Sequence, residues 1–265
     1  MKYLQFLVKL RMEAKLRELS KSIPRRIHDP YFMNKYFVGK GVDIGGFPDP
    51  LLLYVDVFPL LESVQTWDWE QGDAQFMGSV LDGNFDFVNS SHCLEHLVDP
   101  YEGLKNWLRI VKPNGHLVVV VPEEDLYEQG VFPSSLNKDH KWTFTINKKN
   151  SWSNKSISVL DLVESLGEAA ELVRIQKLDI FNHYEWPRFD QTRMPNSESA
   201  IEFVIRKRRI AEMSENINGS PKDERVSFPA EKIPYLNQYK SDQDSLRRQN
   251  QSSIPFGNLE NPSEG

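Results

Sequence analysis

From about residue 38 onward, short apolar runs alternate with longer segments of mixed polarity, a pattern typical of βαβ units around a mostly parallel sheet. The apolar runs predict strands near residues 40–44, 52–57, 64–69, 85–90, 116–121, 171–180 and 200–207. Helical spacing of apolar residues predicts helices near 92–112 and 158–167. We therefore expect an α/β fold with a mostly parallel, seven-stranded sheet and helices on both faces.

The connection between the first two predicted strands is short. Few residues separate Gly46 from the run at 52–57, and Pro48 and Pro50 lie among them. Because proline disrupts the interior of a helix, this segment predicts a shortened first crossover, made of a single turn or an irregular loop.

The pattern also divides the chain into regions. Residues 1–37 are expected to form an N-terminal amphipathic helix, which Pro24 ends, and a linker. Residues 38–210 form the main domain, with a polar and aromatic insertion at 122–157 that is long enough to predict contacts with a substrate. Residues 211–265 are rich in Ser, Asn, Gln, Glu, Lys and Pro without periodicity, which predicts a disordered polar tail.

Composition narrows the class of protein. Of the 265 residues, 39% are hydrophobic and 26% are charged, as is ordinary for a globular protein. The single cysteine, Cys93, excludes an intramolecular disulfide and favours a cytoplasmic setting. The net charge is −6, although residues 1–28 carry eight Lys and Arg against two Glu, so nucleic acid is not the expected partner. Lys9, Arg11 and Lys15 interrupt the apolar N-terminus, so we expect no signal peptide and no integral membrane segment.

Polar residues gather where three predicted strands end. Residues 83–99 pass from an apolar strand into a polar turn and a helix with two histidines and a glutamate. Residues 41–48 end an apolar run in paired glycines, and residues 117–122 form a third strand-to-turn step. Because ligands bind at the carboxyl ends of strands in open α/β sheets, these junctions predict one shared cleft.

Six segments follow one another in a characteristic order. They are Val42-Asp43-Ile44-Gly45-Gly46, Tyr54-Val55-Asp56, Gly72-Asp73-Ala74, Phe85-Asp86-Phe87-Val88, Leu94-Glu95-His96-Leu97 and the run from Leu108 to Gly115. In this order and spacing the chain resembles class I S-adenosylmethionine-dependent methyltransferases of the methyltransferase-11 type, over roughly residues 38–122. The resemblance implies a Rossmann-like fold, S-adenosyl-L-methionine as the cofactor and methyl transfer as the activity.

The resemblance also implies which residues hold the cofactor. The acidic residue and Gly-rich turn after the first strand, which cradle the methionyl part, correspond to Asp43, Gly45 and Gly46. Phe47-Pro48 stands where the family usually has a third glycine. The acidic residue at the end of the second strand, whose carboxylate accepts both ribose hydroxyls, corresponds to Asp56.

Two further segments correspond to contacts with the rest of the cofactor. Asp73 and Ala74 resemble the adenine-binding step after the third strand, where a carboxylate takes the exocyclic amine. Asn89 and Ser90 follow the fourth strand, where the family offers backbone carbonyls to the ammonium group. From residue types alone, Asp73 could equally cap a helix and the paired glycines could form a plain tight turn.

Methyl transfer from a sulfonium needs no covalent enzyme intermediate, so positioning suffices, with one base for a hydroxyl acceptor. His140 in the insertion is expected to be a base or a substrate contact, and His92 is expected to lie nearer the transferred methyl group. The acceptor pocket is expected to include Trp142, His183 and Tyr184. Aromatic walls with a few polar groups suit a small-molecule or glycan-type acceptor.

Two other functions stay open at this point. The fold could serve as a non-catalytic cofactor-binding or scaffold module. Residues 92–96 also fit the H-x-x-E-H pattern of inverted zinc peptidases, whose two histidines would need a further ligand such as His140 or His183. Under the methyltransferase interpretation Glu95 and His96 are structural, no metal is expected, and the oligomeric state is undetermined.

Overall fold

The computed structural model describes residues 18–187 and 197–213, and in this part of the chain the main sheet has six strands. The strands are Gly39–Ile44 (β1), Leu61–Trp67 (β2), Phe85–Ser91 (β3), Val111–Pro122 (β4), Ala170–Leu178 (β7) and Ala200–Lys207 (β8). Their order is β2-β1-β3-β4-β8-β7, with only β8 antiparallel to its neighbours. The predicted Rossmann-like α/β fold with a mostly parallel sheet is confirmed.

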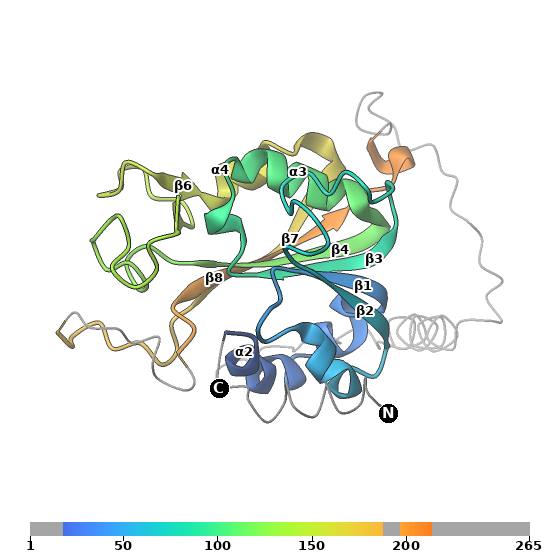
Figure 1. Cartoon of the computed structure of the whole chain (residues 1–265), viewed down its shortest axis with the longest axis horizontal. Helices are drawn as coiled ribbons and strands as arrows, with labels where there is room; N and C mark the ends of the chain where they lie inside the picture. Colours follow the sequence, from blue (N-terminus) through green and yellow to red (C-terminus); the bar gives the residue numbers. More distant parts are fainter. Residues whose placement is uncertain (1–17, 188–196, 214–265) are drawn as a thin grey trace, which may run out of the picture. The chain divides into compact units, whose positions relative to one another are not determined.

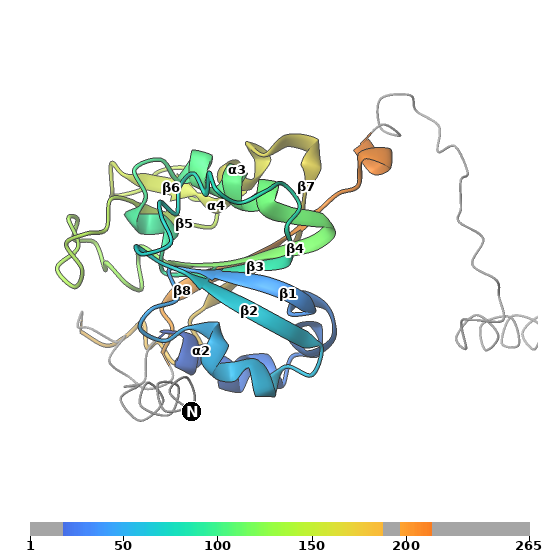
Figure 2. The same ribbon diagram turned by 45° about the vertical axis from the view of Figure 1, so that its right-hand side comes forward.

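Helices cover both faces of the sheet (Figures 1 and 2). One face carries Pro100–Ile110 (α3) and Val159–Glu164 (α4), and the other carries Glu18–Ile27 (α2) with a π-helix at Phe32–Tyr36 (η1) and a 3-10 helix at Leu51–Val57 (η2). Short 3-10 helices lie at Leu94–His96 (η3) and Gly167–Ala169 (η4). Each face buries its own apolar cluster, so the core has two layers.

The predicted strand at 52–57 is wrong, because this run forms the helix η2. Leu51 packs in the core cluster on this face of the sheet and Leu53 is also buried, which a 3-10 turn achieves as well as a strand does. The main sheet therefore has six strands rather than seven. The crossover from β1 to β2 holds this helix and is longer than predicted.

The predicted helix at 92–112 is interrupted. His92 has φ +54°, and η3 ends at His96, three residues before α3 starts afresh. Asp99 caps α3 by accepting hydrogen bonds from the backbone N–H groups of Tyr101 and Glu102, and Pro100 occupies the first helical turn. Residues 92–99 therefore form turns around a short 3-10 helix, and not the first turns of one long helix.

The insertion at 122–157 is held by one buried carboxylate. It contains a small parallel sheet of Thr143–Thr145 (β5) and Ser156–Ser158 (β6). Glu124 accepts hydrogen bonds from the side chains of Thr143, Lys148, Ser151 and Ser156. This network fixes the loop after β4 against the sheet.

The helix α2 is anchored through charged residues. Arg25 and Arg26 form ion pairs with Glu202 on β8, and Arg25 also pairs with Glu198. Pro24 lies inside this helix rather than ending it. The N-terminal part of the predicted amphipathic helix, residues 1–17, and the predicted tail from residue 214 onward lie outside the described residues. Among the described helices, none combines the length and apolarity required to cross a membrane.

Candidate functional site

The strand order changes direction between β1 and β3, which are neighbours, while β2 lies on the far side of β1. In such sheets the carboxyl ends at this point form the ligand crevice. Asp43 on β1 is 1% exposed and accepts hydrogen bonds from the Leu51 backbone N–H at 2.7 Å and from Asn89 Nδ2 at 2.6 Å. Burial raises the pKa of this carboxyl to about 6, against the opposing effect of these two hydrogen bonds.

The glycine turn after β1 is sterically determined. Gly45 has φ +70°, and a Cβ atom there would lie 2.7 Å from the Cβ of Cys93. A Cβ atom on Gly46 would lie 2.3 Å from Oδ2 of Asp43. Burial raises the pKa of the Cys93 thiol to about 12, which agrees with a packing role for this side chain. The turn is therefore closed around Asp43 and Cys93 and presents its backbone outward.

The position predicted for Asp56 is wrong, since this exposed residue lies in η2 and not at a strand end. The acidic residue that directly follows β2 is Asp68. Its Oδ2 accepts a hydrogen bond from the backbone N–H of Phe47, 3.3 Å away, which ties the end of β2 to the glycine turn. The sequence gives only a weak signal for it, because β2 is a mostly polar strand with one buried residue, Val64.

The other predicted cofactor residues separate into two groups. Asn89 and Ser90 are buried in β3 beside β1, where the Ser90 hydroxyl donates to the carbonyl of Ile44 at 3.2 Å. Asp73 and Ala74 lie in the loop that follows β2. Asp73 Oδ1 accepts from the Gln75 backbone N–H at 2.7 Å, so its side chain stabilises a local turn.

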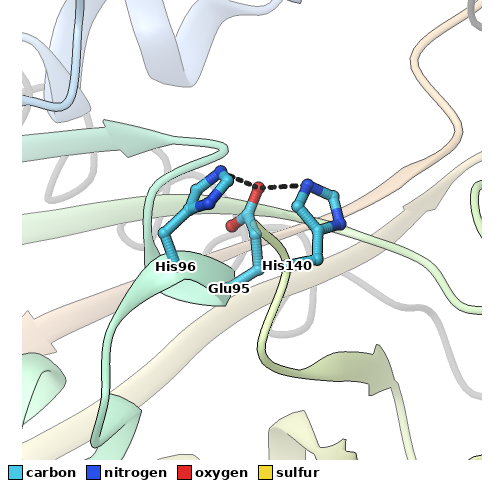
Figure 3. Close-up of side chains that lie close together, drawn as sticks. All are labelled: Glu95, His96 and His140. Atoms are coloured by element: carbon cyan, nitrogen blue, oxygen red, sulfur yellow. Dashed lines mark ion pairs between the residues drawn. The ribbon is translucent and has the colours of Figure 1, made fainter. Parts of the chain in front are cut away.

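A second group of polar side chains forms around Glu95 (Figure 3). The Nε2 atoms of His96 and His140 lie 3.9 Å and 3.8 Å from Glu95 Oε1. Nδ1 of His92 lies 3.5 Å from the same oxygen. Glu95 is 0% and His140 4% exposed. The two histidines predicted to be catalytic, His92 and His140, thus converge on one residue that was predicted to be structural.

Charge in this group is mutually compensated. Burial alone would raise the pKa of the Glu95 carboxyl, but the adjacent imidazole of His92, with smaller effects from His140 and His96, lowers it by more than burial raises it. Burial by itself lowers the pKa of His92, but Glu95 and Glu18 raise it by more, so the net effect is an increase. Oε2 of Glu18 lies 3.6 Å from Nε2 of His92. The resulting arrangement keeps a carboxylate charged inside the protein.

The insertion supplies the other side of this group. His140 Nδ1 lies 2.8 Å from Oε1 of Glu128, a carboxylate that is 3% exposed. Tyr127 stacks on the His140 ring with centroids 5.2 Å apart. The backbone N–H of Lys141 donates to the Glu95 carbonyl at 2.9 Å, which joins the insertion to η3.

The residues predicted to contact the acceptor do not all meet. Trp142 donates from Nε1 to the Leu97 carbonyl at 3.0 Å and packs against the core. His183 and Tyr184 line a separate cavity, together with Asp125, Leu126, Gln129, Asn182 and Trp186. The rings of His183 and Trp186 stack with centroids 3.8 Å apart. Among the described residues, this cavity has the mixed aromatic and polar wall that the sequence predicts for an acceptor.

The helical premise of the zinc peptidase alternative is wrong. That pattern requires its two histidines one turn apart on a helix, whereas His92 precedes η3 with a positive φ. His92 and His96 each approach Glu95 instead of facing a common solvent-exposed ion site.

Comparisons with known proteins find a family model that matches part of the chain. A family model described as a methyltransferase domain matches residues 59–119, from the end of the first crossover to the middle of β4. No curated protein matches the chain. Among solved structures, a SAM-dependent methyltransferase from Archaeoglobus fulgidus aligns at 18% identity over 77% of this chain and 99% of its own, with a TM-score of 0.47. Another, from Aquifex aeolicus, aligns at 12% identity over 76% and 97%, with a TM-score of 0.42.

These structural similarities are too remote to carry an argument, so the assignment rests on the domain match and the sequence segments. The matched segment contains β2, β3 and α3, and with them Asp68, Asn89, His92, Glu95 and His96 but not His140. Residues 59–119 are thus similar to a methyltransferase domain, and this agrees with the resemblance that the six sequence segments carry.

Proposed function

We propose that this domain binds S-adenosyl-L-methionine across the carboxyl ends of β1 and β2 and methylates a small-molecule or glycan-type acceptor. The observation that carries the proposal is the glycine turn braced on Asp43 and tied to Asp68. Gly45 and Gly46 carry no side chains that would block a ligand, and the carboxylate of Asp68 beside them is partly exposed. This combination fits a nucleoside with two vicinal hydroxyls and a charged amino-acid part.

Each proposed contact has a defined chemical task. Gly45 and Gly46 let the methionyl part approach the backbone, and Asp68 accepts the two ribose hydroxyls in place of Asp56. Asp73 and Ala74 contact the adenine, and Asn89 and Ser90 border the amino-acid end. When bound, the sulfonium supplies an electrophilic methyl group; the protein holds the acceptor in line with it and excludes water.

The acceptor is proposed to lie on the side of the sheet edge that His92 and the insertion share. His92 directly follows β3, and the carboxylates of Glu18 and Glu95 lie beside its two ring nitrogens and favour its protonated form, so it is suited to orient the acceptor and not to take its proton. The cavity of His183, Tyr184 and Trp186 supplies aromatic faces with a carboxylate, Asp125, beside them. Such walls suit a sugar ring or a comparable polar metabolite.

Replacing Asp68 by alanine is expected to weaken binding of S-adenosylhomocysteine about 10- to 100-fold, because one charge-assisted pair of hydrogen bonds is lost. Isothermal titration calorimetry on the full chain measures this directly. Asp56→Ala is the matched control: it removes an exposed carboxylate from the adjacent helix η2 and should leave the affinity unchanged.

The reverse result, in which Asp56→Ala weakens binding and Asp68→Ala does not, would contradict the proposed orientation of the cofactor. Absence of any binding by the folded wild-type chain would overturn the proposed function. Transfer of label from S-adenosylmethionine to a panel of sugars and small hydroxylated metabolites then tests the acceptor class.

A further inference from the structure

We propose that Glu95, His96 and His140 bind a divalent transition-metal ion, with Zn²⁺ as the reference ion. The ligating atoms would be Nε2 of each imidazole and a carboxylate oxygen of Glu95. These atoms all lie within 4.8 Å of one another. The proposal goes beyond methyl transfer and does not depend on it.

The first argument is the state of the Glu95 carboxylate. Neither of its oxygens has a hydrogen-bond partner among the described residues, although the side chain is fully buried. A buried carboxylate without hydrogen bonds is costly, and proteins satisfy such groups by pairing or by metal coordination. His92 lies 3.5 Å from Oε1, but its other nitrogen faces Glu18, and Oε2 is left without a donor.

The second argument is how the two imidazoles are held. Nδ1 of His140 lies 2.8 Å from the Glu128 carboxylate, and Nδ1 of His96 lies 3.3 Å from the carbonyl oxygen of Asp139. Both partners accept hydrogen bonds, so each Nδ1 carries the proton and each Nε2 presents a lone pair toward Glu95. A carboxylate or carbonyl behind Nδ1 is the usual outer support of a metal-binding histidine.

The donor set indicates the class of ion. Two imidazole nitrogens and one carboxylate suit Zn²⁺, Fe²⁺ and related first-row ions better than Mg²⁺ or Ca²⁺, which prefer oxygen ligands. Ligand atoms about 2.0–2.2 Å from one Zn²⁺ ion lie roughly 3.3 Å apart. The separations of 3.8 Å and 3.9 Å from Glu95 Oε1 require a contraction of about half an ångström, and ligand atoms that lie up to 4.8 Å apart require a larger one.

The fold permits this contraction at low cost. The His96 side chain is 31% exposed, so its ring can rotate without opening the core. His140 lies on the insertion, whose position relative to η3 is set by the hydrogen bond from the Lys141 backbone to the Glu95 carbonyl. Three protein ligands leave at least one position of a tetrahedral ion open, as in zinc sites that bind substrate or water.

The test is zinc binding by the full-length chain without a histidine tag. The protein is stripped with a chelator, dialysed against Zn²⁺ and assayed for bound metal by elemental analysis, with affinity from competition against a zinc indicator. We expect one zinc per chain. Glu95→Gln and His96→Ala should each weaken binding at least about tenfold, and Glu128→Gln about 10- to 100-fold through its hydrogen bond to His140.

His28→Ala is the control, because His28 is an exposed histidine outside this group and should leave zinc affinity unchanged. Thermal unfolding without metal verifies that each variant is folded. Because the His96 side chain is partly exposed, His96→Ala is the variant expected to disturb the packing of the core least. Zinc should raise the unfolding temperature of the wild type and of His28→Ala but not of His96→Ala.

Failure of the folded wild type to bind a stoichiometric ion would overturn the proposal, as would equal affinities of the wild type and His96→Ala. Binding of S-adenosylhomocysteine is measured separately. A chain that binds zinc but not this compound would contradict only the proposed methyl transfer.

Discussion

Replacement of Glu202 by alanine is expected to lower the free energy of unfolding by about 3–5 kcal/mol, the cost of removing one partner from a buried ion pair. Glu202 on β8 and Arg26 on α2 are both 0% exposed, and Glu202 Oε2 accepts a hydrogen bond from Arg26 Nη2 at 3.1 Å. Arg25 donates to both oxygens of the same carboxylate, at 2.8 Å and 3.0 Å. The substitution leaves the Arg26 guanidinium buried and uncompensated.

The electrostatic environment explains why the loss is large. Burial lowers the pKa of Arg26 from its usual value, against the opposing charge of Glu202. Two nitrogens of Arg26, Nε and Nη1, already lack hydrogen-bond partners among the described residues. Glu202 therefore supplies most of the compensation for this charge, and without it α2 loses its attachment to the sheet.

Urea unfolding monitored by circular dichroism measures this effect. Glu171→Ala is the matched control, because it removes a carboxylate from an ion pair on the adjacent strand β7 whose acidic side chain is 37% exposed. An exposed pair contributes about 0–1 kcal/mol. Equal losses in the two variants would show that burial does not set the energy of the Glu202 pairs.

The fold could be predicted from the sequence wherever periodicity and length agree. The continuous apolar runs at 85–90, 116–121 and 200–207 predicted strands correctly. Such a run is typical of a central strand that is buried on both faces. The run at 52–57 is equally apolar, but a short apolar run does not distinguish a strand from a buried helical turn. Tertiary packing of Leu51 and Leu53 decides in favour of η2.

The position of the second strand along the chain was harder to predict than the presence of a mostly parallel sheet. In β2 only Val64 is fully buried, because this strand lies at the edge of the sheet, and an edge strand carries a weak pattern. The assignment of the second strand to the preceding apolar run led to the prediction that Asp56 binds the ribose. Once η2 is recognised as a helix, the same family rule selects Asp68.

The Glu95 group could be found only in part from the sequence. The clustering of His92, Glu95 and His96 was visible, and His140 was singled out separately. Their convergence depends on the path of the insertion, where the backbone N–H of Lys141 forms a hydrogen bond with the carbonyl of Glu95, 46 positions earlier in the chain. A contact between residues so far apart in the sequence leaves no local pattern from which it could be predicted. The carboxylate of Glu128, which orients His140, had no local signal at all.

Stability of the chain is expected to depend on pH through His116, and replacement by phenylalanine should remove that dependence. His116 on β4 is 7% exposed, its ring lies 5.2 Å from Tyr36, and its Nε2 has no hydrogen-bond partner among the described residues. Burial, followed by the charges of Lys35 and Arg206, lowers the pKa of His116 to about 4; Glu171 opposes this change.

The sign follows from proton binding. Between about pH 4 and the unfolded value of about 6.5, the unfolded chain binds a proton at this position and the native protein does not, so stability rises with pH across this interval. Above pH 6.5 both states are neutral and the penalty is absent. Below pH 4 the loss of unfolding free energy is complete. Because the ring keeps some contact with solvent, we expect this loss to reach about 2 kcal/mol.

Asp43 acts in the opposite direction over nearly the same interval. Its pKa of about 6 lies above the usual value for aspartate, so the native protein binds the extra proton and stability from this group falls as pH rises. The wild-type profile alone is therefore ambiguous. The difference in unfolding free energy between the wild type and His116→Phe isolates the histidine, because the contribution of Asp43 is common to both and cancels. Urea unfolding at pH 4.5 and pH 7.5 should give a difference that shifts by roughly 2 kcal/mol in favour of the variant at the lower pH. A difference that is the same at both values would show that His116 is protonated equally in the two states.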